Sequence, residues 1–417
     1  MDTGDTAWVL TSAALVLFMT PGLALFYAGM VRGKHTLAML MQNFFAMGLI
    51  GVLWAAVGFS LAFGSSGSSG IIGNLDFAFM KDIAMFSAKG EVLNKLPGLD
   101  FLTIPPMAFF AFQMMFAIIT PALITGATAD RLKFRSYAWL IGLWSILVYS
   151  PLAHWVFSPT GWLFKRGALD FAGGTAIHIN AGIAALVVVW MIGHRRGYPQ
   201  QQMAPHSLPL TLLGTGILWF GWFGFNAGSA GAANAQAAQA LVNTSLAASA
   251  AMLGWLVVER VKDGHATTLG GASGAVAGLV AITPCAGYVG GMSPIYIGAA
   301  AGILCYLAIG IKKALNLDDS LDVIAVHLVG GIVGSLLLGF FADKSATGFG
   351  FDGVFFGGGS DLLLDQLTAV GAAIAYSAVA TFIIAKAIDL ISGLRVDADA
   401  EDVGLDLSQH AETAYAS

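Results

Sequence analysis

Two aspartate–histidine pairs stand out among the ionisable residues of this 417-residue chain. Asp170 precedes His178 by eight residues in the stretch ALDFAGGTAIHINAGIAALVVVW. Asp319 precedes His327 by the same interval in DDSLDVIAVHLVGGIVGSLLLG. An imidazole gains or loses a proton near neutral pH, so it can relay or share one. Ionisable rings set among Ala, Gly, Ile and Val are costly and are typical of a substrate path through a membrane.

The composition predicts the elements that must hold these residues. Hydrophobic residues make up 57% of the chain and charged residues only 10%, against about 25% charged residues in an average soluble domain. The 53 glycines lie inside the apolar runs, where small residues let helix backbones approach closely. The alternating ten-residue segments of a β-barrel are lacking. We therefore expect an all-α polytopic membrane protein.

The long apolar runs predict eleven transmembrane helices, each near the ~20 residues needed to cross the hydrocarbon core. They are expected near 6–31, 36–63, 103–128, 136–157, 171–193, 208–228, 236–258, 267–286, 294–311, 322–342 and 362–392. The segment 65–100 is the longest loop. With the N-terminus outside, 13 Lys and Arg residues fall on the inner side and six on the outer side. The positive-inside rule therefore predicts the N-terminus outside and the C-terminus inside.

The matched aspartate–histidine intervals predict an inverted five-plus-five repeat. The fifth predicted span runs inward and the tenth runs outward, as equivalent helices of an inverted repeat do. The halves are expected at about 6–193 and 208–342, followed by the eleventh helix at 362–392. A pseudo-two-fold axis would then bring His178 and His327 together near the bilayer midplane. The alternative is that each histidine is only a polar link between helices.

Three aspartates lie near the starts of predicted spans. Asp170 and Asp319 are expected to cap their helices by accepting free backbone N–H groups. Asp322 is expected to be a further helix cap or a structural acid. Asp170 follows a short outer loop and opens into a glycine pair, so it is also a candidate for stabilising a nearby cation.

Charge and cysteine usage argue against other partners and cofactors. The net charge of −5 includes no basic patch, so no nucleic-acid partner is expected. Cys285 and Cys305 have no metal-ligand spacing, and we expect neither a metal nor a cofactor. A membrane electron carrier with bis-histidine haem is disfavoured, because the glycine-lined setting of the two histidines is too narrow for a macrocycle.

Several motifs closely resemble the ammonium transporter (Amt) family, of the Amt/Mep/Rh superfamily, over nearly the whole chain. They are FYAGMVRGK, FQMMFA, PLAHW, GALDFAGGTAIHINAG, GWFGFNAGSAG, NTSLAA, GAVAGLVAITPCAGYV and DVIAVHLVGGIVG. The resemblance implies a transporter rather than an enzyme. It implies a homotrimer in the cytoplasmic (inner) membrane, with one pore per subunit. Ammonium would be captured in an outer vestibule and deprotonated, and ammonia would pass through a hydrophobic twin-histidine pore.

The resemblance also implies roles for individual residues. By motif match, Phe112 and Phe116 are two stacked rings that occlude the pore, and His178 and His327 are the twin histidines. Ser229 belongs to the vestibule and Asp170 is the buried acid. Phe225 is a further aromatic residue that closes the pore toward the inside. Phe112 and Phe116 are four residues apart and therefore share one helix face. Taken without the resemblance, such a pair is more often packing than a gate.

One position departs from the family pattern. The family usually has tryptophan after AH.V at the vestibule cation site, and this chain has Phe157 in AHWVF. Phenylalanine presents a weaker face to a cation than tryptophan does, although the flanking Trp155 or Trp162 could compensate. The alternative function is an ammonium-sensing receptor of the same fold with little flux.

The chain is expected to divide into a transmembrane domain, 1–393, and a cytoplasmic tail, 394–417. The tail carries six acids, Asp397, Asp399, Glu401, Asp402, Asp406 and Glu412. Composition alone favours a disordered acidic tail. The resemblance implies instead an ordered tail that packs on the cytoplasmic face and bridges subunits. It also implies a PII-type signalling protein as a possible partner at that face.

Overall fold

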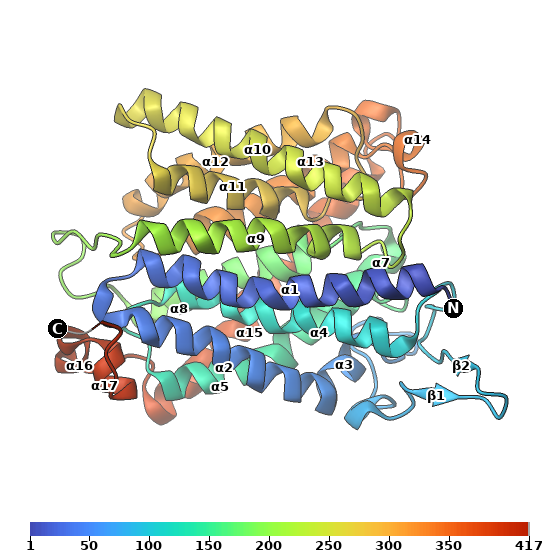
Figure 1. Cartoon of the computed structure of the whole chain (residues 1–417), viewed down its shortest axis with the longest axis horizontal. Coiled ribbons are helices and arrows are strands. Elements are labelled where there is room, and N and C mark those ends of the chain that lie inside the picture. The colour runs from blue at the N-terminus through green and yellow to red at the C-terminus, as the bar shows by residue number, and fades with distance from the viewer. Residues whose placement is uncertain (416–417) are drawn as a thin grey trace.

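A computed structural model describes residues 1–415 as a bundle of long helices that run roughly side by side (Figure 1). The N-terminus and the C-terminal tail lie at opposite ends of the bundle. Within the described residues, ten helical segments are long and apolar enough to cross a membrane. They are Thr3–Met30, Gly33–Phe63, Pro106–Ala127, Phe134–Arg166, Gly174–Ile192, Leu208–Gly228, Ala235–Asp263, Ser293–Ala314, Ile324–Phe341 and Asp361–Ser392. The predicted all-helical membrane fold is confirmed.

The remaining predicted span, near 267–286, corresponds to α11 (Thr268–Ile282), which has only 15 residues. The chain leaves the helix at Thr283 and continues as turns over 283–288. α11 packs against both α10 (Ala235–Asp263) and α12 (Ser293–Ala314), which also contact each other directly. Because α11 is shorter than the ~20 residues that cross a bilayer, the count of eleven and the orientation stay predictions.

Four spans change between α-helical and π-helical geometry along their length. The first span consists of α2 (Thr36–Leu53), the π-helical η2 (Trp54–Gly58) and α3 (Phe59–Phe63), and the second of α5 (Phe134–Trp144), the π-helical η5 (Ser145–Tyr149) and α6 (Ser150–Phe157). In the other two, a π-helical segment comes first: η6 (Gly174–Ile179) before α8 (Asn180–Ile192), and η7 (Ile324–Val329) before α13 (Gly330–Phe341). A π-turn fits an extra residue into the helix and is often found at functional sites. The two histidines lie in η6 and η7.

The other long helices contain no π-helical turn. They are α1 (Thr3–Met30), α4 (Pro106–Leu123), which continues as the 3-10 turn η4 (Ile124–Ala127), α9 (Leu208–Gly228), α10, α12 and α15 (Asp361–Ser392). Glycines set the spacing between α1 and α9, the first helices of the two predicted halves. A Cβ on Gly214 would lie 2.3 Å from the backbone nitrogen of Phe26, and one on Gly221 would lie 2.2 Å from Cγ of Met19. Only glycine allows this approach, as the glycine-rich composition predicts.

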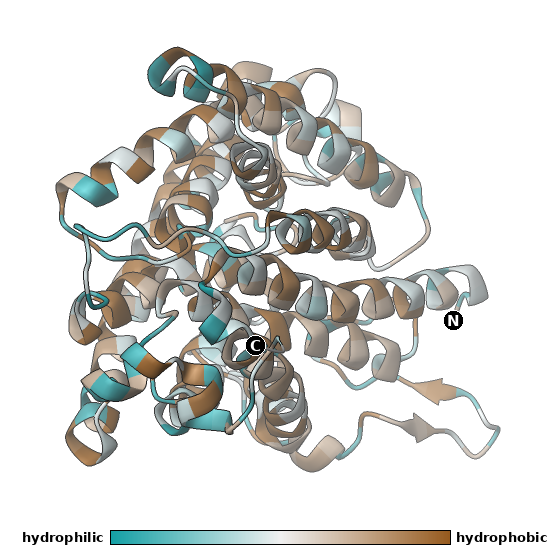
Figure 2. Ribbon diagram, turned by 60° about the vertical axis from the view of Figure 1, so that its left-hand side comes forward, coloured by the Kyte–Doolittle hydropathy of each residue, from teal (hydrophilic) through white to brown (hydrophobic). Residues whose placement is uncertain are grey.

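The outer surface of the bundle is apolar, and polar residues gather at its ends. Exposed side chains include Val52, Trp190, Val261 and Ile391, as expected for helices that face lipid or other subunits. Hydrophilic residues concentrate in the connecting segments and in the tail near the C-terminus (Figure 2). The predicted loop 65–100 contains a short hairpin, β1 (Met85–Phe86) with β2 (Val92–Leu93), which its sequence did not predict.

The tail is ordered through residue 415 and packs on the bundle. It forms two short helices, α16 (Ala398–Val403) and α17 (Leu405–His410). Oδ1 of Asp406 accepts the N–H of Ala38 at 2.8 Å, so the tail lies against the start of α2. Leu405 and Val396 are buried together with Ala38. The composition-based alternative of a disordered tail is therefore wrong, because apolar residues between the acids supply a packing face.

Candidate functional site

His178 and His327 meet inside the bundle. Their Nδ1 atoms are 3.2 Å apart, their ring planes differ by 13°, and both side chains are buried. This distance fits one hydrogen bond between the rings. The pairing expected from the matched intervals is therefore present.

The Nδ1–Nδ1 contact limits how the pair can carry protons. One ring must donate its Nδ1–H and the other must accept with a bare Nδ1. When both rings are neutral, the donor ring has a bare Nε2 and the acceptor ring has Nε2–H. Nε2 of His178 has no hydrogen-bond partner among residues 1–415. The pair therefore offers one acceptor and one donor beyond its internal bond, and exchanging the tautomers reverses the two.

Two glycines bring the histidine helices together in a symmetric crossing. Gly182 follows His178 by four residues, and its added Cβ would lie 2.5 Å from the backbone nitrogen of Leu328. Gly331 follows His327 by four residues, and its added Cβ would lie 2.9 Å from Cγ1 of Ile179. Each glycine thus contacts the residue that follows the opposite histidine. This reciprocity is what two equivalent helices related by a pseudo-two-fold axis require.

Asp170 caps the helix that carries His178, as predicted. Its Oδ1 accepts the N–H groups of Gly173 and Gly174 at 2.9 and 2.6 Å. Its Oδ2 accepts those of Thr175 and Ala176 at 2.8 and 3.1 Å. The carboxylate is buried, so these four donors replace the water that a charged group would otherwise need.

Asp319 caps the helix that carries His327, but with fewer bonds. It accepts the N–H of Val323 at 3.1 Å and that of Ile324 at 2.8 Å. Lys312 donates to its carbonyl oxygen at 2.7 Å and also pairs with Asp322. Asp322 is therefore a structural acid, whereas Asp319 is the cap.

A narrow cavity of about 20 Å³ lies beside the histidine pair. This is roughly the room that one water-sized molecule needs. Its walls are mostly apolar, and its polar members are Tyr27, His178, Trp222, Ser273 and His327. The cavity can hold a small neutral molecule, whereas a bare ion would lose its hydration there at great cost.

Aromatic rings cover the histidine pair on one side. Phe112 and Phe116 have ring centroids 4.8 Å apart and planes at 79°. The two rings therefore meet edge to face, whereas the resemblance implied a stacked pair. Phe116 also contacts Phe225, with centroids 4.5 Å apart. Quadrupoles of aromatic rings favour this geometry over a face-to-face stack.

The position of Phe225 corrects a prediction. We expected its ring to close the pore toward the inside. It lies in the last turn of α9, which ends at Gly228, and its centroid is 6.2 Å from that of His178. The ring therefore stands between Phe116 and His178, on the same side of the histidine pair as the two other phenylalanines.

The residues expected at the vestibule lie around the end of α9 and the end of α6. Ser229 follows α9, and its hydroxyl donates to the carbonyl oxygen of Phe225 at 2.8 Å. Its single proton is thus committed, and its lone pairs can only accept. Phe157 is the half-buried last residue of α6.

Trp155 does not compensate for Phe157. Its Nε1 donates to the carbonyl oxygen of Ile71 at 2.7 Å, and its buried ring contacts those of Trp162 and Tyr376, with centroids 5.6 and 4.8 Å away. These contacts fasten the outer loop and α15 to α6. The face of Trp155 is therefore covered.

Sequence reasoning missed Trp222. Its ring stacks on that of His178, with centroids 5.5 Å apart and planes at 16°, and its Nε1 donates to Oγ1 of Thr283 at 2.9 Å. Trp222 precedes Phe225 by three residues, a spacing that puts both on one helix face. This spacing within GWFGFNAG was the available signal.

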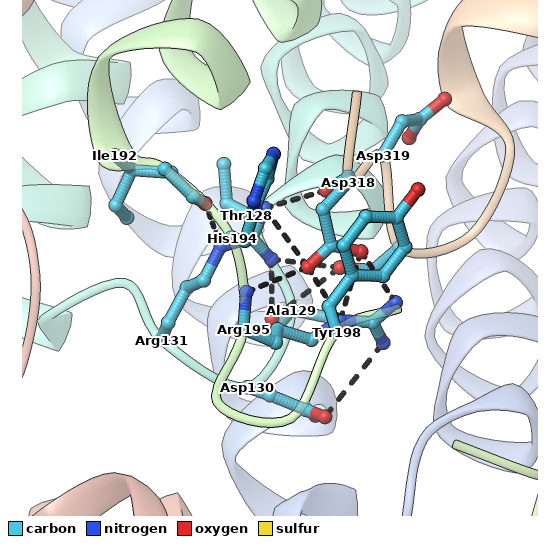
Figure 3. A network of polar contacts seen from close by, with 12 residues as sticks. Thr128, Ala129, Asp130, Arg131, Ile192, His194, Arg195, Tyr198, Asp318 and Asp319 are labelled. Atoms are coloured by element: carbon cyan, nitrogen blue, oxygen red, sulfur yellow. Dashed lines mark hydrogen bonds and ion pairs between the residues drawn. The ribbon is translucent and has the colours of Figure 1, made fainter. Parts of the chain in front are cut away.

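Sequence reasoning also missed a buried ionic network at the end of the bundle that carries the tail (Figure 3). Arg195 holds Asp318 through two nitrogens, with Nη2–Oδ1 and Nε–Oδ2 distances of 2.7 and 3.0 Å. Arg131 is fully buried and donates to the carbonyl oxygens of Gly193 and Asp318 at 2.9 and 2.6 Å. The network ties the end of the His178 helix to the segment that starts the His327 helix.

Burial and charge compete within this network. Burial alone would raise the pKa of the Asp318 carboxyl, but the hydrogen bonds and charge of Arg195, with the charge of Arg131, hold that pKa below its ordinary value. Burial lowers the pKa of Arg131 to about 10, with Asp318 opposing the shift. All three groups are therefore charged at neutral pH.

The tail joins the same network. Arg395 pairs with Glu401 at 2.7 Å and donates to the carbonyl oxygen of Ile192 at 3.3 Å. Glu401 also accepts the N–H of Arg196 at 2.6 Å. The tail thus contacts the loop that follows the His178 helix.

A helical membrane bundle that encloses a narrow apolar cavity and a buried histidine pair is the architecture of a membrane transport protein. Comparison with known proteins identifies the kind. The sequence profile of the Ammonium Transporter Family matches residues 7–415. The chain is 48% identical to the ammonium transporter of Mycobacterium tuberculosis, over 99% of this chain and 90% of that protein. It is 46% identical to the ammonium transporter Amt1 of Archaeoglobus fulgidus, over 100% of both.

Solved structures give the same result. The crystal structure of Saccharomyces cerevisiae Mep2 matches with a TM-score of 0.87 and 34% identity, over 96% of this chain and 88% of that one. A sensor Amt protein matches with a TM-score of 0.86 and 30% identity, over 97% of this chain and 98% of that one. The chain belongs to the ammonium transporter family, a family of membrane transporters and not of enzymes.

Proposed function

We propose that the protein moves ammonium, as ammonia, across the cytoplasmic membrane. The observation that carries this proposal is the histidine pair beside a cavity of about 20 Å³, behind the rings of Phe112, Phe116 and Phe225. The names of the related proteins support ammonium as the substrate.

Capture would begin outside the aromatic rings. The lone pairs of Ser229 can accept a hydrogen bond from an ammonium proton, and aromatic faces attract a cation. A potassium ion of similar size has no proton to donate, so hydrogen-bond acceptors discriminate where diameter cannot.

Passage would then require deprotonation, with the released proton relayed through His178 and His327 while ammonia crosses, so that ammonia and proton together carry one net charge per turnover. Carrying a full charge through a dry apolar cavity is very costly, whereas neutral ammonia fits the space available. Ammonia can both donate and accept hydrogen bonds. It therefore matches the one acceptor and one donor that His178 and His327 offer, whichever ring holds the internal proton.

The transmembrane domain 1–393 would work in a homotrimer, with the tail 394–417 as its regulatory part. The contacts of Arg395 and Glu401 with the loop after the His178 helix support a coupling of the tail to the path. Membership of the family implies a PII-type signalling protein as a partner at the cytoplasmic face.

Ammonium-elicited current in proteoliposomes tests the proposed transport. The protein should give a saturable current with ammonium, none with potassium at equal ionic strength, and a greatly reduced ammonium current in a His178→Ala/His327→Ala double variant. Equal currents with ammonium and potassium would refute passage by deprotonation.

The second candidate function is an ammonium-sensing receptor with little flux. Phe157 at the vestibule and the likeness to a sensor Amt protein favour it. Ammonium that raises the melting temperature of the purified protein in a saturable way, without any current, would support sensing over transport.

A further inference from the structure

The outer part of α1 continues the helix face that borders the cavity. Met19, Leu23 and Phe26 line the cavity beside the histidine pair. At 100° per residue, Ser12 and Trp8 lie roughly 20° on either side of Met19 around the helix. The same face therefore runs outward past the phenylalanines to Ser12 and then to Trp8.

Ser12 is a buried hydroxyl without a partner. Its side chain is fully buried, and its Oγ has no hydrogen-bond partner within the part of the chain that the structure describes. A Cβ on Gly228 would lie 2.7 Å from Oγ of Ser12 and 2.8 Å from Cε2 of Phe112. The hydroxyl of Ser12 therefore lies close to both Gly228 and the ring edge of Phe112. A buried polar atom with no partner costs stability, and a ligand with N–H groups would satisfy it.

Trp8 lies one helical turn further out. Its Nε1 donates to the carbonyl oxygen of Ala227 at 3.2 Å, which fixes the indole across the end of α9, beside Ser229. Its side chain is only partly buried. The contacts of Trp155 cover the ring of that other tryptophan, whereas the partly buried indole of Trp8 keeps part of its surface free at the end of α9.

We propose that Trp8 and Ser12 form the α1 side of the outer cation site, which takes a small protonated amine such as ammonium or methylammonium. The indole supplies the strong cation-binding face that Phe157 lacks, and Ser12 accepts one N–H. The ligand class rests on the proposed function, whereas the assignment of these two residues rests on the contacts of α1. Ser229 and Ser12 then offer acceptors from two different helices, at the end of α9 and on α1.

The test compares Trp8→Leu and Ser12→Ala with the wild type by ammonium-elicited current in proteoliposomes. Half-saturation should rise about 2- to 5-fold for Trp8→Leu, the range of a partly hydrated cation–aromatic contact, and about 3-fold or more for Ser12→Ala, the range of one hydrogen bond. Adding Phe157→Trp to Trp8→Leu should restore much of the affinity. Trp190→Leu, an exposed tryptophan on α8, is the matched control and should leave half-saturation unchanged.

A second readout separates this inference from the proposed transport. Ammonium chloride should raise the melting temperature of the purified protein in a saturable way, which sodium chloride should not do. If the wild type shows this rise in melting temperature but no current, only the proposed transport is refuted. The variants would then be compared by the ammonium concentration that gives half of the rise in melting temperature. Trp8→Phe, which keeps an aromatic ring, serves if Trp8→Leu does not fold. Variants that keep the wild-type half-saturation would overturn the inference and leave Ser12 a hydroxyl bonded within α1. A wild type that neither conducts nor binds ammonium would overturn both proposals.

Discussion

Replacing Asp170 tests whether this carboxylate acts by capping, by charge or by both. In the folded protein its two oxygens accept four backbone N–H groups, two on each oxygen. Asp170→Ala would leave all four donors buried without a partner, at about 1–3 kcal/mol each. The total of about 4 kcal/mol or more is a large part of the 5–15 kcal/mol that holds a typical protein folded.

Asp170→Asn should be less damaging to the fold. The amide oxygen can keep the bonds from Gly173 and Gly174, whereas the amide nitrogen would face the N–H groups of Thr175 and Ala176. Two donors are lost, so we expect a cost of about 2 kcal/mol or more. Asp319→Ala is the matched control, because it removes only two N–H bonds from the equivalent position of the other half.

The assay is the apparent melting temperature of the purified protein in detergent, followed by ammonium current in proteoliposomes. The melting temperature should fall most for Asp170→Ala, and by smaller, similar amounts for Asp170→Asn and Asp319→Ala. If Asp170→Ala melts no lower than Asp319→Ala, the count of backbone bonds does not explain this residue. If Asp170→Asn folds and conducts at the normal rate, its charge has no role in transport.

Four further predictions concern the histidines, the tail and the buried network. His178→Ala or His327→Ala should reduce ammonium current or alter its selectivity while the melting temperature changes little; loss of the folded protein instead would mark the pair as structural. Deleting 394–417 should lower the flux and leave the proposed trimer intact by size-exclusion chromatography, and an unchanged flux would contradict the proposed coupling. Arg195→Leu should cost about 3–5 kcal/mol, since it leaves the Asp318 carboxylate buried without its main partner, and an unchanged melting temperature would refute this. The pKa of Asp318 is lowered in the folded state. Its contribution to the free energy of unfolding is therefore complete above the ordinary pKa of about 3.9 and disappears as the pH falls through the lowered value. Acid should therefore destabilise Asp318→Asn less than the wild type.

Features with a local signal could be predicted from the sequence. The apolar runs predicted nearly all the helices, and the matched aspartate–histidine intervals predicted the contact between His178 and His327. Asp170 and Asp319 could be predicted as caps because a cap bonds to N–H groups a few residues further along. Hydropathy did not reveal that α11 is short, because the run without charged residues continues past Ile282.

Features built from distant segments could not be predicted. Arg131, Arg195 and Asp318 come from three separate connections, and nothing local marks them as partners. The contact of Phe116 with Phe225 joins α4 to the end of α9, two segments far apart in the sequence. The short spacing from Phe112 to Phe116 predicted a shared helix face but no ring geometry.

The hydrogen-bond partners of Asp170 are near it in the sequence and that of His178 is far away, and this difference has a consequence for biosynthesis. All four partners of Asp170 lie within six residues of it, so the carboxylate can be satisfied as soon as its own helix forms. The partner of His178 lies 149 residues further along the chain, and Gly182 likewise awaits Leu328. While the ribosome is still making the second half, the first half must therefore hold an unpaired imidazole and an open glycine surface in the bilayer. Completion of the tenth span would close that surface, and a chain that stalls before it should be a substrate for membrane quality control.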